Sequence, residues 1–178
     1  MDEAAPKPNP MLEPRIGKVV VNVSVGESGD PLDKAMTIVE QITGQKPCQR
    51  QARRTIRAFG ISKNEPVACM VTLRGARAEE FLRRALEAVG NKISPRSFDG
   101  NGNFAFGIRE HIDIPGTRYD PTLGIIGMDI MVAVERPGYR VRRRRLRNRI
   151  GRRHRVASED AVEFIRDRFG TEVVLPGE

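Results

Sequence analysis

Residues 16–25, IGKVVVNVSV, hold the pattern that most constrains the fold, because apolar and polar side chains alternate along them. One face would carry Val19, Val21, Val23 and Val25, and the other would carry Lys18, Val20, Asn22 and Ser24. The same period of two occurs in residues 67–75, 97–114 and 127–135. Alternation of this kind is typical of strands that bury one face and leave the other exposed. These segments therefore predict a sheet.

Three further segments show helical periodicity, with an apolar residue at every third or fourth position. They are residues 31–43, 77–90 and 159–169. We expect Asp30 to cap the first helix and Ser158 to cap the last, with a glycine at the end of each helix. Helices packed on one face of a sheet would bury both kinds of apolar surface. The predicted fold class is α+β, with a largely antiparallel sheet, helices on one face and a basic C-terminal extension.

The length of 178 residues fits one domain with a core and is short for two. Residues 1–14 contain four prolines and are expected to form a flexible lead-in. Residues 15–178 are expected to form the single domain, with an arginine-rich extension at 136–178. No apolar run approaches the roughly 18 residues that span a bilayer, and the N-terminus lacks a signal-peptide pattern. We therefore expect a cytoplasmic protein with no membrane partner.

The cysteines and histidines give little sign of a metal centre. Cys48 and Cys69 are far apart and form no CxxC pair, so we interpret both as small apolar fillers. His111, in the strand-like REHIDI, and His154, in a basic run, are also distant from each other. We expect no metal, no cofactor and no catalytic residues.

Residues 140–155, RVRRRRLRNRIGRRHR, contain ten arginines and one histidine, with no acid and no lysine. The arginines are Arg140, Arg142, Arg143, Arg144, Arg145, Arg147, Arg149, Arg152, Arg153 and Arg155. Without these ten, the 31 lysines and arginines fall to 21 against 23 acids, a net charge of −2. The basic excess is therefore local. A concentrated basic segment is typical of proteins that bind nucleic acid or an anionic membrane.

Several interpretations of this arginine-rich segment compete. A charge run is commonly a solvated tail, but here a predicted helix and an apolar TEVVL follow it, which favours a segment held on a surface. A membrane patch would need more interleaved apolar residues. DNA remains open on charge alone, although no helix-turn-helix, zinc-finger or basic-zipper pattern is present. RNA is the favoured partner, because guanidinium groups fork onto phosphates and stack on bases.

A second basic window covers residues 41–64, with six basic residues and no acid. They are Lys46, Arg50, Arg53, Arg54, Arg57 and Lys63. The aromatic residues are only seven Phe and two Tyr, with no Trp. Binding is therefore expected to depend on charge and shape more than on base stacking.

The segment DGNGNFAFG places Gly100, Gly102 and Ala105 at the spacing of a dinucleotide-binding fingerprint. That fingerprint requires a helix after it, whereas NFAFGI reads as a strand, so a glycine-rich loop is favoured. Asp99, Glu110, Asp113 and Asp120 could be imagined as a carboxylate cluster, but they fall at turns and strand edges. An enzyme or RNA-processing factor that uses this loop and these acids stays as the rival hypothesis.

Seven stretches, in this order, carry a resemblance to a known family. They are KVVVNVSVGES, ITGQKP, ARRTIRAFGISKNEP, VTLRG, SFDGNGNFAFGIREHIDIPG, YDP and GIIGMDIMVAVERPGYRV. The chain resembles the fifth protein of the large ribosomal subunit, over roughly residues 10–175. The segments RRRR, IGRRHR and SEDAVEFIRDRFG resemble the extension of archaeal and eukaryotic members, which favours an archaeal type.

The resemblance implies a non-enzymatic ribosomal protein that binds 5S rRNA and helps to anchor it in the central protuberance. It also implies contacts with large-subunit rRNA, P-site tRNA and neighbouring ribosomal proteins, including those of the small-subunit head. Positions matching those that meet 5S rRNA are Asn22, Gln45, Lys46, Thr72 and Arg74. The loop implied to face P-site tRNA or rRNA carries Arg50, Arg53, Arg54, Arg57 and Lys63. The loop implied to form an intersubunit bridge carries Arg96, Phe98, Asp99, Asn101 and Asn103. The ten arginines of residues 140–155 are expected to contact rRNA phosphates.

Overall fold

The computed structural model describes residues 9–174, and residues 1–8 of the expected lead-in lie outside the described part, as do residues 175–178. The strands are β1 (Arg15–Ser24), β2 (Cys48–Gln51), β3 (Pro66–Leu73), β4 (Lys92–Ile93), β5 (Phe104–Ile108), β6 (Met128–Glu135) and β7 (Glu172–Val173). The α-helices are α1 (Asp30–Thr43), α2 (Ala76–Ala88) and α3 (Ser158–Phe169). Short 3₁₀ helices cover Arg57–Phe59, Pro95–Ser97, His111–Asp113, Tyr139–Arg142 and Arg152–His154.

Five strands form one sheet in the order β2-β3-β1-β6-β5, and every neighbouring pair is antiparallel. In the central strand, Val21 pairs with Val71 of β3 and with Ile130 of β6. The short strands β4 and β7 form a separate parallel pair. This topology confirms the predicted α+β fold with a largely antiparallel sheet.

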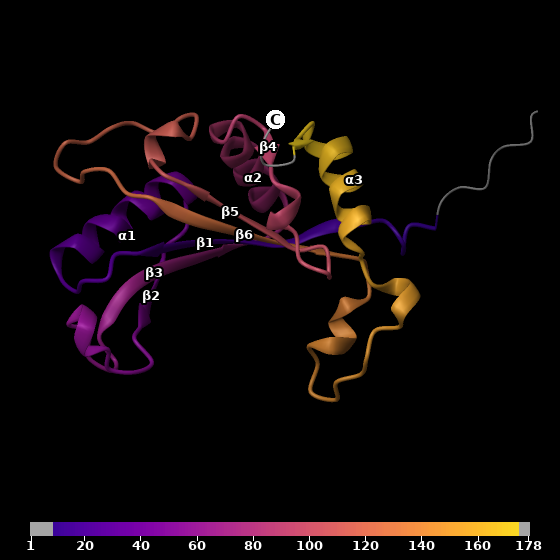
Figure 1. Ribbon diagram of the computed structural model, residues 1–178, viewed down its shortest axis with the longest axis horizontal. Helices are drawn as coiled ribbons and strands as arrows, with labels where there is room; N and C mark the ends of the chain where they lie inside the picture. The colour runs from indigo at the N-terminus through magenta and orange to yellow at the C-terminus, as the bar shows by residue number, and fades with distance from the viewer. Residues whose placement is uncertain (1–8, 175–178) are drawn as a thin grey trace, which may run out of the picture.

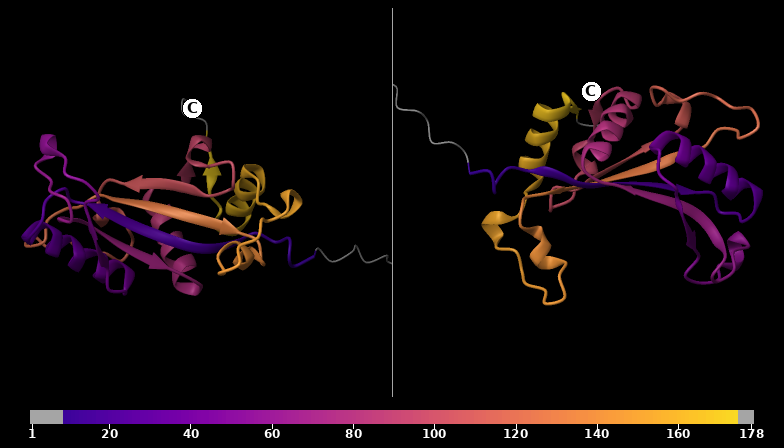
Figure 2. Two further views of the ribbon diagram at one scale, coloured as in Figure 1. Left: turned by 90° about the horizontal axis from the view of Figure 1, so that it is seen from below. Right: turned by 180° about the vertical axis from the view of Figure 1, so that it is seen from behind.

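The core lies between one face of this sheet and the helices, which cover the same side of it in Figures 1 and 2. Val19, Val21 and Val23 are buried there, as expected from the alternation in β1. They belong to one apolar cluster with Leu32 of α1, Phe81 of α2 and Ile165 of α3. Burying each side chain of this size contributes about 1.5–3 kcal/mol, so the pattern of period two determines which sheet face is covered.

The strand expected over residues 97–114 is much shorter than predicted. β5 contains only Phe104–Ile108, and His111–Asp113 form a 3₁₀ helix. The chain leaves the sheet after Ile108, and His111 and Ile114 are then both buried. Two buried side chains three residues apart fit the repeat of a 3₁₀ turn, which the alternation in the sequence concealed.

The predicted caps of two helices are also wrong. Asp30 and Ser158 are the first helical residues, so the cap positions fall on Gly29 and Ala157, neither of which makes a side-chain cap bond. In α3 the carboxylate of Asp160 accepts a hydrogen bond from the N–H of Ala157 at 3.2 Å, which satisfies a free donor at this end.

The two cysteines differ in environment. Cys69 is a buried filler, as expected, and burial raises the pKa of its thiol. Cys48 is exposed, so its interpretation as a filler is wrong. It lies on β2, an edge strand whose four residues are all exposed.

Candidate nucleic-acid interface

The sheet face opposite the helices is open. β1 presents Lys18, Val20, Asn22 and Ser24 on it, flanked by Met70 and Thr72 of β3 and by Asp129, Met131 and Ala133 of β6. In Figure 1 this face looks towards the bottom of the view, where none of the described α-helices lies against it. Methyl groups, amides, hydroxyls and a lysine thus share one accessible surface.

The first of two projections beside this face is the β2–β3 arm, residues 48–65. Its base is closed by hydrogen bonds from the N–H of Ala52 to the Glu65 carbonyl (2.8 Å) and from the N–H of Asn64 to the Ala52 carbonyl (2.9 Å). The Glu65 carboxylate accepts hydrogen bonds from the N–H of Ser62 and the hydroxyl of Ser28, both at 2.8 Å. These bonds, the Ser62 one first, hold the pKa of Glu65 below its ordinary value. Glu65, the one acid of the β2–β3 arm, therefore helps to hold the base of the arm in place.

The basic side chains of the β2–β3 arm are exposed, as expected for the second basic window. They are Arg50, Arg53, Arg54, Arg57 and Lys63. None of them forms an ion pair within residues 9–174. The arm therefore presents uncompensated positive charge.

The second projection is the arginine arm, residues 136–156, and its two ends are joined by a polar stem. The guanidinium of Arg136 donates to the carbonyls of Arg153 (3.2 Å) and Arg155 (3.0 Å) and to the carboxylate of Asp160 (2.8 Å). The hydroxyl of Tyr139 accepts from the N–H of Val156 at 2.9 Å and donates to the His154 carbonyl at 3.3 Å. The arm is therefore fastened to the start of α3 and is not a free tail.

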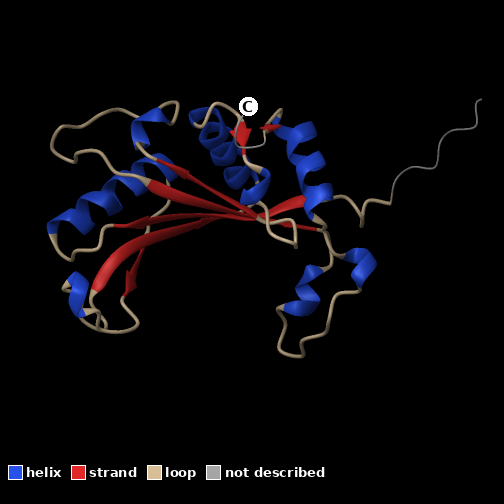
Figure 3. Ribbon diagram, in the orientation of Figure 1, coloured by secondary structure: helices blue, strands red, loops and turns tan. Residues whose placement is uncertain are grey.

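All ten arginines of residues 140–155 are exposed. Of these, only Arg143 pairs with an acid in the described part of the chain, and its partner is Glu135 at the end of β6. The arm consists mostly of loop with two short helical turns, as Figure 3 shows. It therefore holds a dense set of unpaired guanidinium groups outside the core.

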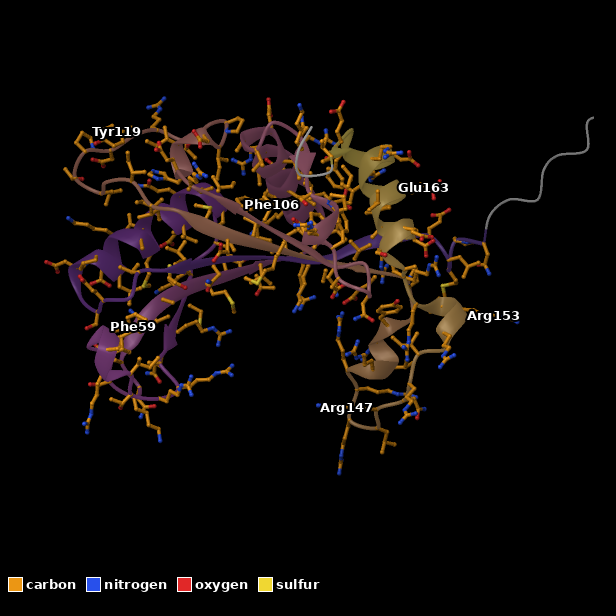
Figure 4. The ribbon with its side chains drawn as sticks, in the orientation of Figure 1. Phe59, Phe106, Tyr119, Arg147, Arg153 and Glu163 are labelled. Carbon is orange, nitrogen blue, oxygen red and sulfur yellow. The ribbon has the colours of Figure 1, made fainter. Side chains whose placement is uncertain are left out.

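The two arms lie on either side of the open sheet face. In Figure 1 both extend below the sheet, the β2–β3 arm on the left and the arginine arm on the right. Figure 4 shows the same relation at the level of side chains, with Phe59 on the first arm and Arg147 on the second. An open sheet face flanked by two positively charged arms suits a polyanion laid across the sheet.

The residues carried over from the family as contacts to 5S rRNA gather along the β1–β3 pair. Thr72 lies on the open face beside Val20, and Asn22 occupies the next outward position of β1. The Gln45 amide donates to the Thr72 carbonyl at 3.4 Å, and the Arg74 guanidinium reaches the Gly17 carbonyl at 3.4 Å. Lys46 is exposed next to Gln45. The fold thus brings this set together although the sequence separates it.

The glycine-rich loop folds around Asp99. Its carboxylate accepts from the N–H groups of Asn101 and Asn103 and from the Asn103 side-chain amide, each at 2.8 Å. Burial raises the pKa of Asp99, but the hydrogen bonds from Asn103 and Asn101 outweigh it and hold the pKa below its usual range. Phe98 packs on Phe104 with ring centroids 5.0 Å apart. Asp99 and Phe98 therefore shape the loop, while Arg96 and Asn101 are exposed to solvent.

Two regions of the sequence match models of one protein family. Residues 9–61 match Ribosomal protein L5, and residues 66–164 match the C-terminus of the same ribosomal family. The large ribosomal subunit protein uL5 of Aeropyrum pernix is 52% identical over 170 residues, which cover 94% of this chain and 88% of the relative. Its counterpart in Sulfurisphaera tokodaii is 51% identical over 168 residues, 93% of this chain and 95% of that one.

The chain belongs to the ribosomal protein L5 family. A third relative, the large ribosomal subunit protein uL5 of Pyrobaculum aerophilum, is 48% identical and covers 94% of each chain. These relatives are archaeal, so the expected archaeal type is confirmed. No helix within residues 9–174 has the length and apolar character to cross a bilayer.

The structure of this L5-family chain shows interface features that sequence reasoning missed. Among large apolar side chains in the described part, Leu146 and Phe59 are the most exposed, at 80% and 74%. Each lies in one of the two arms, in RRRRLRNR and IRAFGI. The sequence signal for this feature was an apolar residue inside a run of charged residues. A charged segment that only meets solvent has no use for an exposed apolar side chain.

The stem of the arginine arm was also missed, and it carries a prediction. Replacing Arg136 by Gln is expected to lower the free energy of unfolding by about 2–3 kcal/mol, because two carbonyls and a carboxylate lose their donor. Arg168, which pairs with Glu79 at 3.2 Å between exposed side chains, is the matched control. Its change to Gln should cost about 0–1 kcal/mol in urea unfolding. Equal losses for the two variants would mean that the stem does not anchor the arm.

His111 makes stability depend on pH. It is buried, its Nδ1 lies 3.3 Å from the backbone nitrogen of Ile126, and burial lowers its pKa from the ordinary 6.5. The unfolded chain therefore takes up the proton first as pH falls, so the free energy of unfolding should decrease from about pH 7 towards the folded-state pKa. In His111→Gln, urea unfolding at several pH values should show a flatter dependence. An unchanged slope would mean that His111 is not the group responsible.

Proposed function

We propose that this chain is a structural protein of the large ribosomal subunit that binds 5S rRNA and helps to anchor it in the central protuberance. The observation that carries the proposal is the open sheet face between two arms rich in unpaired arginine. Membership of the ribosomal protein L5 family supports a ribosomal role. The 5S rRNA would lie against the β1–β3 surface that holds Asn22, Thr72, Gln45, Lys46 and Arg74.

The arginine arm is proposed to hold rRNA phosphates, those of 5S rRNA included. Its guanidinium groups are exposed, and the loop that carries them is already closed at both ends by the Arg136 and Tyr139 bonds before RNA arrives. Preorganised donors lose less conformational entropy on binding than a free tail does. Neighbouring ribosomal proteins of the central protuberance would complete the assembly.

The β2–β3 arm is proposed to contact 5S rRNA and to approach the P-site tRNA. It projects from the sheet edge with exposed Arg53, Arg54 and Arg57. Phe59 gives it an apolar ring to place against a base or sugar. The charge of this arm supports the proposal better than any single contact does.

An intersubunit contact with the small-subunit head is proposed for the glycine-rich loop. Phe98, Asp99 and the Asn103 amide are engaged within the loop itself. The contact would therefore fall to the exposed Arg96 and Asn101. Changing both to Ala should weaken subunit association without lowering 5S rRNA binding.

The test is binding of the purified chain to 5S rRNA, compared with a transcript of equal length and unrelated sequence. With about 6 to 10 phosphates contacted, affinity should fall roughly 10³ to 10⁵-fold between 50 and 200 mM salt. Preference for 5S rRNA at physiological salt supports the proposal. Equal affinity for both RNAs, or no binding at low salt, would refute it.

The rival is an enzyme or RNA-processing factor that acts through the glycine-rich loop and nearby acids. Against it stands the engagement of Asp99, whose two carboxylate oxygens accept hydrogen bonds from the loop. One carboxylate oxygen of Asp120, Oδ1, accepts from both the N–H and the hydroxyl of Thr122. The rival predicts nucleotide turnover that is lost in Asp99→Asn, and co-sedimentation with large subunits distinguishes assembly from a free factor.

A further inference from the structure

A groove of about 700 Å³ lies where the open sheet face meets the arginine arm and the glycine-rich loop. Its size falls within the range of sites that enclose a small molecule, roughly 300–1,000 Å³. It would hold one nucleotide, whereas a double helix is far larger. The three surfaces that line it differ in chemistry and are described in turn.

The floor of the groove is apolar. It is built from Val20 of β1, Met131 and Ala133 of β6, and Ala105 of β5. Strand register places Met131 directly between Val20 and Ala105, so these side chains form a continuous patch. Met131 is 38% exposed, and it is the most exposed large apolar residue of the five-stranded sheet. These apolar side chains have no charge and no hydrogen-bond donor for a phosphate.

One wall of the groove is cationic. Arg142, Arg143 and Arg147 of the arginine arm line it, together with Lys18 from β1. Glu135, the acid on this side, is paired with Arg143, so the uncompensated charge of this wall comes from Arg142, Arg147 and Lys18. A phosphate or the 3′ and 5′ linkages of a nucleotide would be held at this wall.

The glycine-rich loop contributes a side-chain amide in a fixed orientation to the groove. Asn103 lines the groove, and its Nδ2 donates to the Asp99 carboxylate at 2.8 Å. That bond determines which end of the amide is turned away from Asp99, and this end is the Oδ1 acceptor. An oriented acceptor at the edge of an apolar floor suits the hydrogen-bonding edge of a base.

We infer that this groove binds a single unstacked nucleotide of the RNA, with its base on Met131, its phosphates at the arginine wall and a base edge at Asn103. A regular helix keeps its bases stacked inside and would leave the apolar floor covered by water. An unstacked base has a π face that covers it. The inference rests on the proposed function, because it takes RNA to be the ligand.

The six methionines provide the test, since their methyl groups can be labelled with ¹³C and observed by NMR. The probes are hexauridylate and an abasic ribose-phosphate hexamer of the same charge. Hexauridylate should move the Met131 methyl resonance upfield through the ring current of a stacked base, and the abasic hexamer should not. Met70, on the open face but outside the groove, and Met36, on α1, are internal controls.

A pair of matched variants measures the contribution of the floor. Met131→Ala should remove the advantage of hexauridylate over the abasic hexamer, which is expected to be about two- to tenfold in affinity for a methionine against a base. Met36→Ala, on α1 and away from the open face, should preserve that advantage. Loss of the advantage in both variants would overturn the assignment to this groove.

The outcomes separate this inference from the proposed function. If 5S rRNA binds with a steep salt dependence but Met131 responds equally to both hexamers, the groove inference fails and the proposed function stands. A shift of Met131 by hexaglutamate as large as that by hexauridylate would also overturn it, because the site would then accept an acidic peptide. If 5S rRNA itself does not bind, the proposed function fails, and the groove inference, which rests on it, fails with it.

Discussion

Replacing Arg144, Arg145 and Arg147 by serine is expected to lower the salt dependence of 5S rRNA binding by about two to three units of slope. The slope of log K against log salt changes by roughly 0.7 to 0.9 for each phosphate contact that is lost. These three side chains are exposed and form no ion pair in the described residues. Arg143 is left in place because it is paired with Glu135.

The matched control replaces the same number of arginines on the helical side of the molecule. Arg77 and Arg83 of α2 and Arg166 of α3 are exposed there. The control triple has the same net charge as the test triple, so a general charge effect would lower both slopes alike. We expect a large decrease of the salt slope for the test triple and little change for the control triple, both measured by filter binding from about 50 to 200 mM salt.

Replacing Gly102 by alanine is expected to lower the free energy of unfolding by about 2–4 kcal/mol. Gly102 is buried and has φ +76, a left-handed conformation that disfavours alanine. A Cβ there would lie 2.7 Å from a methyl group of Val156 and 3.1 Å from the Ala157 carbonyl oxygen. Overpacking at such a place costs about 1–3 kcal/mol in addition to the backbone strain.

Gly100, two residues earlier, is the control. A Cβ at that position meets nothing within 4 Å, and no left-handed φ is found there. Gly100→Ala should therefore change stability by less than about 0.5 kcal/mol in urea unfolding. Similar losses for the two variants would contradict the close packing of the loop against the start of α3.

Gly102 also explains the fingerprint-like spacing in the sequence. The glycine is needed for close contact with Val156 and Ala157, at the junction of the arginine arm and α3. The strand β5 follows it, as the alternation in NFAFGI predicts, and no helix begins there. The loop thus helps to position the arginine arm.

The sheet and its buried face could be predicted because both follow from local periodicity. The alternation in β1, β3 and β6 determines which side chains meet the helices, and the valines of β1 are buried as expected. The fold class could be predicted for the same reason. Basic windows likewise could be located from charge alone.

Features that depend on distant contacts could not be predicted. The turn at His111 depends on the N–H group of His111 bonding the carbonyl of Ile126. The fastening of the arginine arm depends on Arg136 and Tyr139 reaching residues 153–160 across a loop. Neither interaction leaves a periodic signal, so the sequence indicated a basic segment without its shape.

Phenylglyoxal modification with and without bound 5S rRNA tests whether the open sheet face and its two arms form the interface, since it reports which arginine side chains the RNA covers. We expect protection of Arg53, Arg54 and Arg57 on the β2–β3 arm and of the arginines within residues 142–149 on the arginine arm, while Arg77 and Arg83 of α2 stay reactive. Protection of the helical side, with both arms still reactive, would contradict an interface on the open face of the sheet.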